Sequence, residues 1–243
     1  MTNVFDYLFW RGDLTFNSSP FNETDAVILS RFAYLPFELL SESFSKDNPL
    51  SIEKIADKML KIENIEEKIL QKNDYRLLTE LAKARRFNGL VVTDFESRFD
   101  KETQTQFSAL SVRLQKNLLL VCFRGTDNTL VGWKEDFNMG FVCPVPAQIS
   151  AVRYLRRTAE KQSGEIITAG HSKGGNLAVY SAVKVDEKIK NRIKSVYNFD
   201  GQGFDEKLLL TDDYKQIRKK VTTFVPQSSV VGMLLFHEEN YII

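Results

Sequence analysis

Cysteine, histidine and net charge are all scarce in this chain of 243 residues. It has 2 cysteines and 2 histidines, and 33 Lys and Arg residues against 32 Asp and Glu residues leave a formal net charge of +1. This balance predicts no overall attraction to nucleic acid or to an anionic membrane. The cysteines, Cys122 and Cys143, fit a reducing cytoplasm, and no spacing of Cys and His residues is typical of a metal site.

Long apolar runs and linker-like stretches are also missing. The longest apolar runs are short, as in LLLVCF at residues 118–123, whereas a membrane-spanning helix needs roughly 18 consecutive apolar residues. The N-terminal MTNVFDYLFWRGD lacks the basic start and apolar run of a secretory signal. With 43% hydrophobic and 27% charged residues, the composition is typical of a folded protein. We therefore expect a soluble, cytoplasmic protein with a single domain over residues 1–243.

Helical patterns dominate the first third of the chain. Asn22 or Thr24 is expected to cap a helix that ends near Pro36, because apolar residues recur at helical spacing between them. Residues 51–86 predict two further helices, with isoleucines and Met59 three or four residues apart among Glu and Lys. This second stretch is expected to pack on a larger body or to form a cap or lid over a site.

The pattern changes to strands after Gly89. Residues 90–99 and 103–114 are rich in Val, Thr, Phe and Ser and predict an antiparallel hairpin. Short apolar runs at residues 118–123, 165–169, 194–199 and 220–225 are typical of buried parallel strands, and residues 147–161, 174–185 and 204–210 predict helices between them. The expected fold class is therefore α/β: a three-layer sandwich with a mostly parallel sheet that opens with the hairpin.

One motif in this framework carries chemistry. The strand-like EIITA leads into Gly170, His171, Ser172, Lys173 and Gly174, and a helix-like NLAVYSAV follows. In a G-x-S-x-G turn between strand and helix, the serine is held in strained geometry with its hydroxyl exposed, and the glycines avoid clashes. The motif therefore predicts that Ser172 is a nucleophile, with Gly170 and Gly174 forming the elbow.

A second stretch gives the first motif a family resemblance. The run LLLVCF is followed by Arg124, Gly125 and Thr126 and then by Trp133 and Asp136, ahead of GHSKGGNLA. Over residues 118–183 this pattern resembles the class 3 lipases of the α/β-hydrolase superfamily. The resemblance implies an ester substrate and an oxyanion hole formed by the backbone N–H groups of Thr126 and Lys173. The N-terminal segments DYLFWRGDLTF and PFNETDAVILSRFAYLPFE resemble a bacterial family of uncharacterised α/β-hydrolase-like proteins.

Neighbouring side chains in these motifs have simpler interpretations. Arg124 is expected to form an ion pair with Asp127 or Asp136 that holds the loop. The side chain of Trp133 is expected to pack against its neighbours in a structural role. The Lys173 side chain is expected either to contact an anion or to be solvated. His171 is expected to be structural, because an elbow points the neighbours of its nucleophile away from the site.

A serine nucleophile needs a general base and an acid that orients it. His237 is the remaining histidine and therefore the candidate base; it follows Ser172, as the order Ser, acid, His requires. A surface histidine without a catalytic role is an equally simple interpretation. Asp200, at the end of an apolar strand, is the first choice for the acid and Asp205 the second. Asp212 and Asp213 are typical of a solvated turn.

The pattern departs from the class 3 lipases at the acid. In those lipases the acid follows the next strand, whereas here VTTFV is followed by Pro226, Gln227, Ser228 and Ser229 without a carboxylate. The chain stops at an apolar run, and in the bacterial family it continues and carries further histidines. A truncated C-terminus, with the true base beyond residue 243, is therefore a second expectation.

These features lead to one functional prediction and one alternative. The prediction is a serine-dependent acyl hydrolase, with Ser172, His237 and Asp200 as catalytic residues and with a small-molecule or lipid ester as substrate. No cofactor, metal or nucleic-acid partner is expected. The alternative is a hydrolase-fold protein without turnover that serves as a binding or regulatory module.

Overall fold

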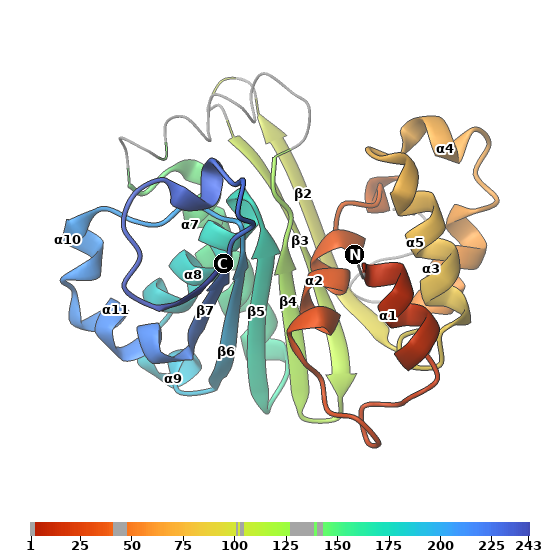
Figure 1. Ribbon diagram of the computed structural model, residues 1–243, viewed down its shortest axis with the longest axis horizontal. Coiled ribbons are helices and arrows are strands. Elements are labelled where there is room, and N and C mark those ends of the chain that lie inside the picture. Colours follow the sequence, from red (N-terminus) through yellow and green to blue (C-terminus); the bar gives the residue numbers. More distant parts are fainter. Residues whose placement is uncertain (1–2, 41–47, 101, 103–104, 127–138, 140–142) are drawn as a thin grey trace.

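A mixed β-sheet forms the centre of the molecule (Figure 1). The computed structural model describes residues 3–40, 48–100, 102, 105–126, 139 and 143–243. Within these ranges the sheet has eight strands, whose spatial order follows the sequence: β1 (Leu50–Ser51), β2 (Val91–Asp100), β3 (Thr105–Gln115), β4 (Leu118–Phe123), β5 (Glu165–His171), β6 (Ile193–Phe199), β7 (Val221–Phe224) and β8 (Asn240–Ile242).

The first part of the sheet is antiparallel and the second part is parallel. β2 pairs with β3 from Val91 opposite Arg113 to Asp100 opposite Thr105, which confirms the predicted hairpin. β3 is antiparallel to β4, and the strands from β4 to β8 are parallel to one another. The four short apolar runs of the sequence are the strands β4 to β7. The predicted α/β fold class, a mostly parallel sheet that opens with a hairpin, is therefore confirmed.

Five of the described helices cover one face of this sheet: α7 (Pro146–Lys161), α8 (Lys173–Lys184), α9 (Glu187–Lys190), α10 (Glu206–Leu209) and α11 (Asp212–Ile217). The strands from β4 onward are added one after another at the same edge. When right-handed connections between parallel strands always advance in one direction, the helices in these connections lie on the same face of the sheet. Tyr154, Leu177 and Tyr214 from these helices accordingly share a core cluster with Val121 and Val196 of the sheet.

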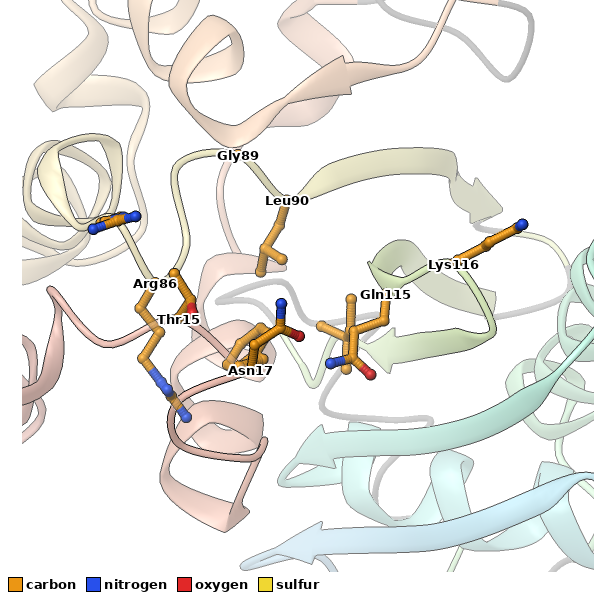
Figure 2. Close-up of a pocket in the computed structure, with 10 residues that line it drawn as sticks. Thr15, Asn17, Arg86, Gly89, Leu90, Gln115 and Lys116 are labelled. Atoms are coloured by element: carbon orange, nitrogen blue, oxygen red, sulfur yellow. The ribbon is translucent and has the colours of Figure 1, made fainter.

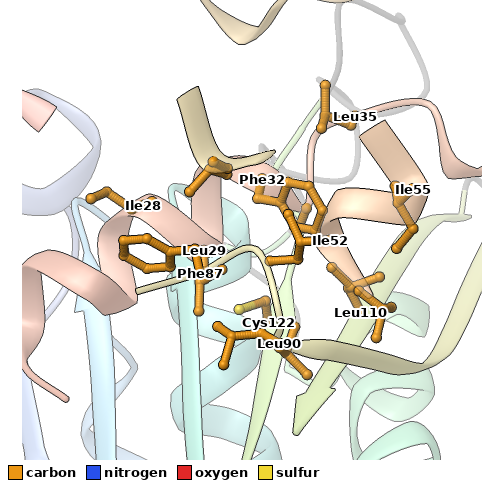
Figure 3. Packing of buried hydrophobic residues seen from close by; sticks show 14 of the residues in the cluster. Ile28, Leu29, Phe32, Leu35, Ile52, Ile55, Phe87, Leu90, Leu110 and Cys122 are labelled. Atoms are coloured by element: carbon orange, nitrogen blue, oxygen red, sulfur yellow. The ribbon is translucent and has the colours of Figure 1, made fainter. Parts of the chain in front are cut away.

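The opposite face is covered by helices that precede the hairpin: α1 (Val4–Arg11), α2 (Glu23–Phe32), α3 (Ile52–Met59), α4 (Ile65–Lys68) and α5 (Lys72–Lys83). Figure 3 shows Ile52 and Ile55 of α3 close to Leu110 of β3, and Leu29 and Phe32 of α2 belong to the same core cluster. The two helical groups thus bury the two faces of one sheet, which makes three layers. None of the helices in the described ranges is both long and apolar enough to span a bilayer.

Local sequence explains where the N-terminal helices begin and end. Asn22, rather than Thr24, caps α2, because its side chain accepts hydrogen bonds from the backbone N–H groups of Thr24 and Asp25. Residues 51–86 form three helices instead of the predicted two. Asn64 adopts a left-handed conformation with φ 54°, and Ile69 is extended, so the helical path is interrupted on both sides of α4.

A buried ion pair connects the end of this N-terminal layer to its beginning. Arg86 donates to both carboxylate oxygens of Asp25, at 2.7 and 2.5 Å, and both side chains are 0% exposed. The remaining donors of its guanidinium group bind the backbone oxygens of Leu14, Ser19 and Pro20 at 2.9–3.1 Å. Arg86 therefore holds the turn before α2 and the start of α2 in place.

We predict that Arg86→Met lowers the free energy of unfolding by about 3–5 kcal/mol, because it leaves the buried carboxylate of Asp25 without its counter-charge. Lys61→Met is the matched control, since Lys61 pairs with Asp57 on the surface, and we expect it to cost less than about 1 kcal/mol. Urea unfolding of both variants measures the difference. Equal losses in the two variants would contradict the role assigned to Arg86.

Candidate active site

Ser172 occupies a strained turn between β5 and α8. β5 ends at His171, α8 begins at Lys173, and Ser172 between them has φ 56° and ψ −133°. Residues other than glycine rarely adopt a positive φ, and such strain costs of order 1–3 kcal/mol. Its backbone is held on both sides, because Ser172 N donates to Phe199 O at 2.9 Å and Gly175 N donates to Ser172 O at 2.8 Å. The surrounding structure therefore maintains the strained conformation.

The two motif glycines allow the turn to close. A Cβ atom on Gly170 would stand 2.1 Å from Gly174 O, and a Cβ atom on Gly174 would stand 2.1 Å from Phe123 O. No side chain fits at such distances. β4, β5 and the first turn of α8 thus meet at backbone contact, the close approach that the G-x-S-x-G motif predicts.

The loop that follows β4 passes directly beside Ser172. A Cβ atom on Gly125 would lie 3.3 Å from Ser172 Cβ and 2.6 Å from His171 O. Thr126 follows Gly125 in the chain, and Lys173 follows Ser172 at the start of α8. The two residues expected to form an oxyanion hole therefore adjoin two segments that are in contact. Three other residues of this motif lie outside the described residues: Asp127, Trp133 and Asp136. The guanidinium group of Arg124 forms an ion pair with Glu38, with 3.8 Å between Nη1 and Oε1.

The side chain of Lys173 is buried, which corrects the expectation that it contacts an anion or is solvated. The residue is 2% exposed, and its Nζ donates to Gln106 O at 2.9 Å and to Gln106 Oε1 at 3.2 Å. Gln106 lies in β3, so the ammonium group ties the start of α8 to the antiparallel part of the sheet.

The imidazole of His171 contacts Tyr34 of the N-terminal layer. Its Nδ1 lies 3.1 Å from the hydroxyl of Tyr34, a residue that follows α2. Burial and the nearby Arg31 charge lower the pKa of His171, so its imidazole is neutral at pH 7. These contacts agree with a structural role for His171.

His237 is paired with a carboxylate that the sequence did not suggest. Its Nδ1 lies 2.8 Å from Glu239 Oε1, and the two side chains are 9% and 4% exposed. The other ring nitrogen, Nε2, is buried without a hydrogen-bond partner in the described structure. It points toward Gly203, where a Cβ atom would be 3.0 Å away. Within the described ranges, neither histidine forms a hydrogen bond with Ser172 Oγ.

Three side-chain hydrogen bonds hold the Glu239 carboxylate, and the backbone N–H of Glu238 donates a fourth at 3.0 Å. Besides His237, Thr223 Oγ1 donates to it at 2.5 Å and Tyr214 Oη at 2.7 Å. Burial alone would raise the pKa of Glu239, but these hydrogen bonds outweigh burial and lower the pKa to about 2. Glu239 is therefore an ionised, nearly buried carboxylate. A His-x-Glu spacing on an extended segment places both side chains on one face, and that signal was available in the sequence.

A chain of buried polar groups leads from this pair to the serine turn. Thr223 Oγ1, which donates to Glu239, accepts from Asn198 Nδ2 at 3.2 Å. Asn198 also binds Gly201 through both its amide oxygen and its amide nitrogen, at 2.9 and 3.2 Å. A Cβ atom on Gly175, in the first turn of α8, would lie 2.0 Å from Asn198 Oδ1. Side-chain hydrogen bonds and packing thus connect Glu239 to the start of α8.

The structure places Asp200 in a different environment from His237. Asp200 follows β6 with φ 57°, and its Oδ1 accepts a hydrogen bond from Ser229 Oγ. Its backbone N–H donates to Phe224 O at 2.8 Å. The described residues contain no hydrogen bond between Asp200 and His237. Ser229 belongs to the carboxylate-free segment after β7, so this segment binds the expected acid instead of supplying one.

The second-choice acid, Asp205, and the turn residue Asp213 both have structural partners. Asp205 caps α10, with its Oδ1 accepting from Leu208 N at 3.0 Å. Asp213 receives a hydrogen bond from Lys190 at 2.5 Å. Among the described residues, no group of three or more His, Cys, Asp or Glu side chains is arranged to hold a metal ion.

An apolar cavity of about 430 Å³ opens beside this site. His171 and Asp200 line it, together with apolar residues from α2 and from the carboxyl ends of the parallel strands: Val27, Phe199, Phe224, Val225, Pro226, Ile242 and Ile243. In parallel α/β sheets, ligands bind at the carboxyl ends of the strands. The cavity therefore lies where a ligand of this fold is expected.

A second cavity lies at the opposite end of the sheet. Figure 2 shows Asn17, Leu90 and Gln115 around this space of about 360 Å³. Gln115 ends β3, which is antiparallel to β4, so this is the amino end of the parallel strands. Its lining includes no histidine or carboxylate, and Arg86 in its wall is committed to Asp25.

Solved structures with a similar fold include two fungal proteins. A fungal lipase in complex with an inhibitor is 14% identical, with a TM-score of 0.52, over 86% of this chain and 71% of that chain. A variant of the MDLA protein from Penicillium cyclopium is 15% identical, with a TM-score of 0.51, over 89% of this chain and 77% of that chain. At this identity the likeness shows the fold, which is a lipase-like α/β-hydrolase fold.

Comparisons at the level of sequence give one result. A search of curated proteins finds no match. The model of a protein family described as Mbeg1-like matches residues 81–243, which include the hairpin, the serine turn and the histidine–glutamate pair.

The tight contact beneath Ser172 predicts a difference between two glycines. Gly174→Ala should lower the free energy of unfolding by at least about 2 kcal/mol, because its Cβ atom would overlap Phe123 O. Gly89→Ala is the control, since a Cβ atom there meets nothing within 4 Å, and its effect should stay within about 0.5 kcal/mol. Chemical denaturation compares the two. Similar stabilities would show that β4 and α8 do not meet closely.

The low pKa of Glu239 predicts how stability depends on pH. Because its pKa in the folded state is below that in the unfolded state, the carboxylate stabilises the fold above about pH 5. This contribution, about 3 kcal/mol, is lost as the pH falls from about 5 to about 2. In Glu239→Gln the free energy of unfolding should fall by about 3 kcal/mol less between pH 5 and pH 2 than in the wild-type chain. Glu238→Gln, at an exposed neighbour, should retain the wild-type pH profile, and a wild-type profile in both variants would contradict the assignment.

Proposed function

We propose that this chain, which belongs to the Mbeg1-like family and has a lipase-like α/β-hydrolase fold, is a serine-dependent acyl hydrolase that cleaves carboxylic esters. The observation that carries the proposal is the conformation of Ser172, with φ 56° between the end of β5 and the start of α8. A strained non-glycine residue is retained where the surrounding structure forces it, and such residues cluster at functional sites.

The proposed reaction has two stages. Ser172 Oγ attacks the ester carbonyl, a base takes the hydroxyl proton, and the carbonyl oxygen becomes an oxyanion. The backbone N–H groups of Thr126 and Lys173 are proposed to bind that oxyanion, one from the loop after β4 and one from the start of α8. When the alcohol leaves, it takes the proton from the base. Water then hydrolyses the acyl–serine by the same steps and releases the carboxylic acid.

We assign the base to His237 and the orienting carboxylate to Glu239. The hydrogen bond from Nδ1 to Glu239 keeps the proton on that nitrogen, so the buried Nε2 carries the lone pair that a general base needs. Asp200 was the first choice from the sequence, but Ser229 binds its carboxylate, whereas Glu239 already binds the imidazole. The assignment requires Nε2 to reach Ser172 Oγ when substrate binds.

The lining of the apolar cavity beside the serine turn favours an ester with an apolar acyl group. Apolar side chains form most of its wall, and His171 in that wall directly precedes Ser172. Burying a methylene group contributes about 0.8 kcal/mol. A small-molecule or lipid ester with an apolar acyl chain is therefore the proposed substrate class.

Covalent labelling tests the proposal. Intact-mass spectrometry after incubation with a fluorophosphonate should show one adduct on the wild-type chain and none on Ser172→Ala, because labelling needs an activated serine and an oxyanion site. His237→Ala and Glu239→Gln should label at least about tenfold more slowly, since they remove the base or its orientation. The Ser172→Ala chain should unfold at the wild-type denaturant concentration.

The same experiment separates the alternative function. The described structure contains no hydrogen bond between Ser172 Oγ and an imidazole, an observation that favours a hydrolase-fold binding module without turnover. A wild-type chain that does not label would support this alternative and contradict the hydrolase. Labelling that persists in Ser172→Ala would contradict the assignment of the nucleophile.

A further inference from the structure

Tyr34 joins the two backbone segments that would form the oxyanion hole. Its hydroxyl accepts a hydrogen bond from Gly125 N at 3.1 Å, donates to His171 O at 3.3 Å and lies 3.1 Å from His171 Nδ1. Gly125 precedes Thr126, and His171 precedes Ser172. Tyr34 itself is 5% exposed and comes from the N-terminal layer, at the end of α2.

These three contacts fit the donor and acceptor capacity of a phenolic hydroxyl. Such a group has one hydrogen to donate and two lone pairs that accept. If the hydrogen goes to His171 O, the lone pairs accept from Gly125 N–H and from a protonated His171 Nδ1. The three contacts therefore fit a neutral His171 that carries its proton on Nδ1.

The Tyr34 hydroxyl lies too close to the loop after β4 to allow a side chain at position 125. A Cβ atom on Gly125 would stand 2.2 Å from Tyr34 Oη. The hydroxyl thus lies directly against the backbone of the loop, and the loop cannot approach or recede without breaking the hydrogen bond from Gly125 N. This contact fixes the separation between the Thr126 segment and the serine turn.

The ring of Tyr34 is in turn anchored by the helices. The guanidinium group of Arg31 lies 4.5 Å from the ring centroid, within the range of a cation–π interaction. Arg31 also donates two hydrogen bonds, both at 2.6 Å, to the nearly buried carboxylate of Asp74 in α5. A continuous series of contacts therefore runs from α5 through Arg31 and Tyr34 to the serine turn.

We infer that Tyr34 is a positioning residue of the proposed active site, whose hydroxyl holds the Thr126 amide at a fixed distance from Ser172. This inference rests on the proposed function and extends it to a residue outside the family match at 81–243. An oxyanion site is effective when its donors are held in place before the reaction, because no energy is then spent in arranging them. Tyr34 is proposed to act through its hydrogen bonds with Gly125 and His171.

Tyr34→Phe tests this inference, with Tyr7→Phe as the matched control. Tyr7 lies in the same helical layer, and its hydroxyl also makes two hydrogen bonds, donating to Asp25 and accepting from Asn22, both at 3.0 Å. With a chromogenic short-chain ester, Tyr34→Phe should lower kcat at least about tenfold and leave KM within about twofold of wild type, because the Thr126 amide acts mainly in the transition state. Tyr7→Phe should change both constants by less than about twofold.

A second measurement does not depend on activity. Amide hydrogen exchange at Gly125 should be at least about tenfold faster in Tyr34→Phe than in wild type and unchanged in Tyr7→Phe, because only the first variant removes the acceptor of that N–H. Unchanged exchange, or a loss of kcat that Tyr7→Phe shares, would overturn the inference. If the wild-type chain is inactive but exchange at Gly125 responds as expected, the proposed hydrolase fails while the clamp between the two segments stands.

Discussion

The order of the strands constrains the rest of this molecule. From β4 to β8 each strand is added next to the previous one, and right-handed crossovers then carry the connecting helices to a single face of the sheet. The other face would expose the apolar side chains of β3, β4 and β5 to water. The helices that precede the hairpin cover that face and bury those side chains in one continuous cluster. The N-terminal layer is thus required by the topology of the sheet.

The same layer shapes the candidate active site. Its helix α2 packs against the central strands β4, β5 and β6, and the chain immediately after it places the hydroxyl of Tyr34 between Gly125 and His171. On the other face, Glu239, Thr223 and Asn198 form a polar chain that ends beneath the serine turn. Ser172 therefore lies at the carboxyl edge of the sheet with hydrogen-bonded supports on both sides. A strained turn persists under these conditions, because relaxing it would break contacts in both layers.

The features that could be predicted from the sequence are local ones. The turn at Ser172 depends on residues within two positions of the serine, and the hairpin and parallel strands depend on short apolar runs, so spacing alone indicates them. The partners of the site come from distant parts of the chain. Tyr34 and His171 are 137 residues apart, and no local pattern marks the tyrosine. The burial of Lys173 follows from its contact with Gln106 in β3, a pairing that exists only once the sheet has formed. The expected order of Ser, acid and His places the acid before His237, whereas Glu239 follows it in the chain.

The central claim is that the backbone N–H groups of Thr126 and Lys173 face one oxygen atom bound at Ser172. A crystal structure of the chain after reaction with a fluorophosphonate tests it most directly, because the phosphonyl oxygen occupies the position of the oxyanion. We expect the phosphorus on Ser172 Oγ and its oxygen within about 3.2 Å of both backbone nitrogen atoms. An adduct whose oxygen points into solvent, away from both amides, would contradict the account.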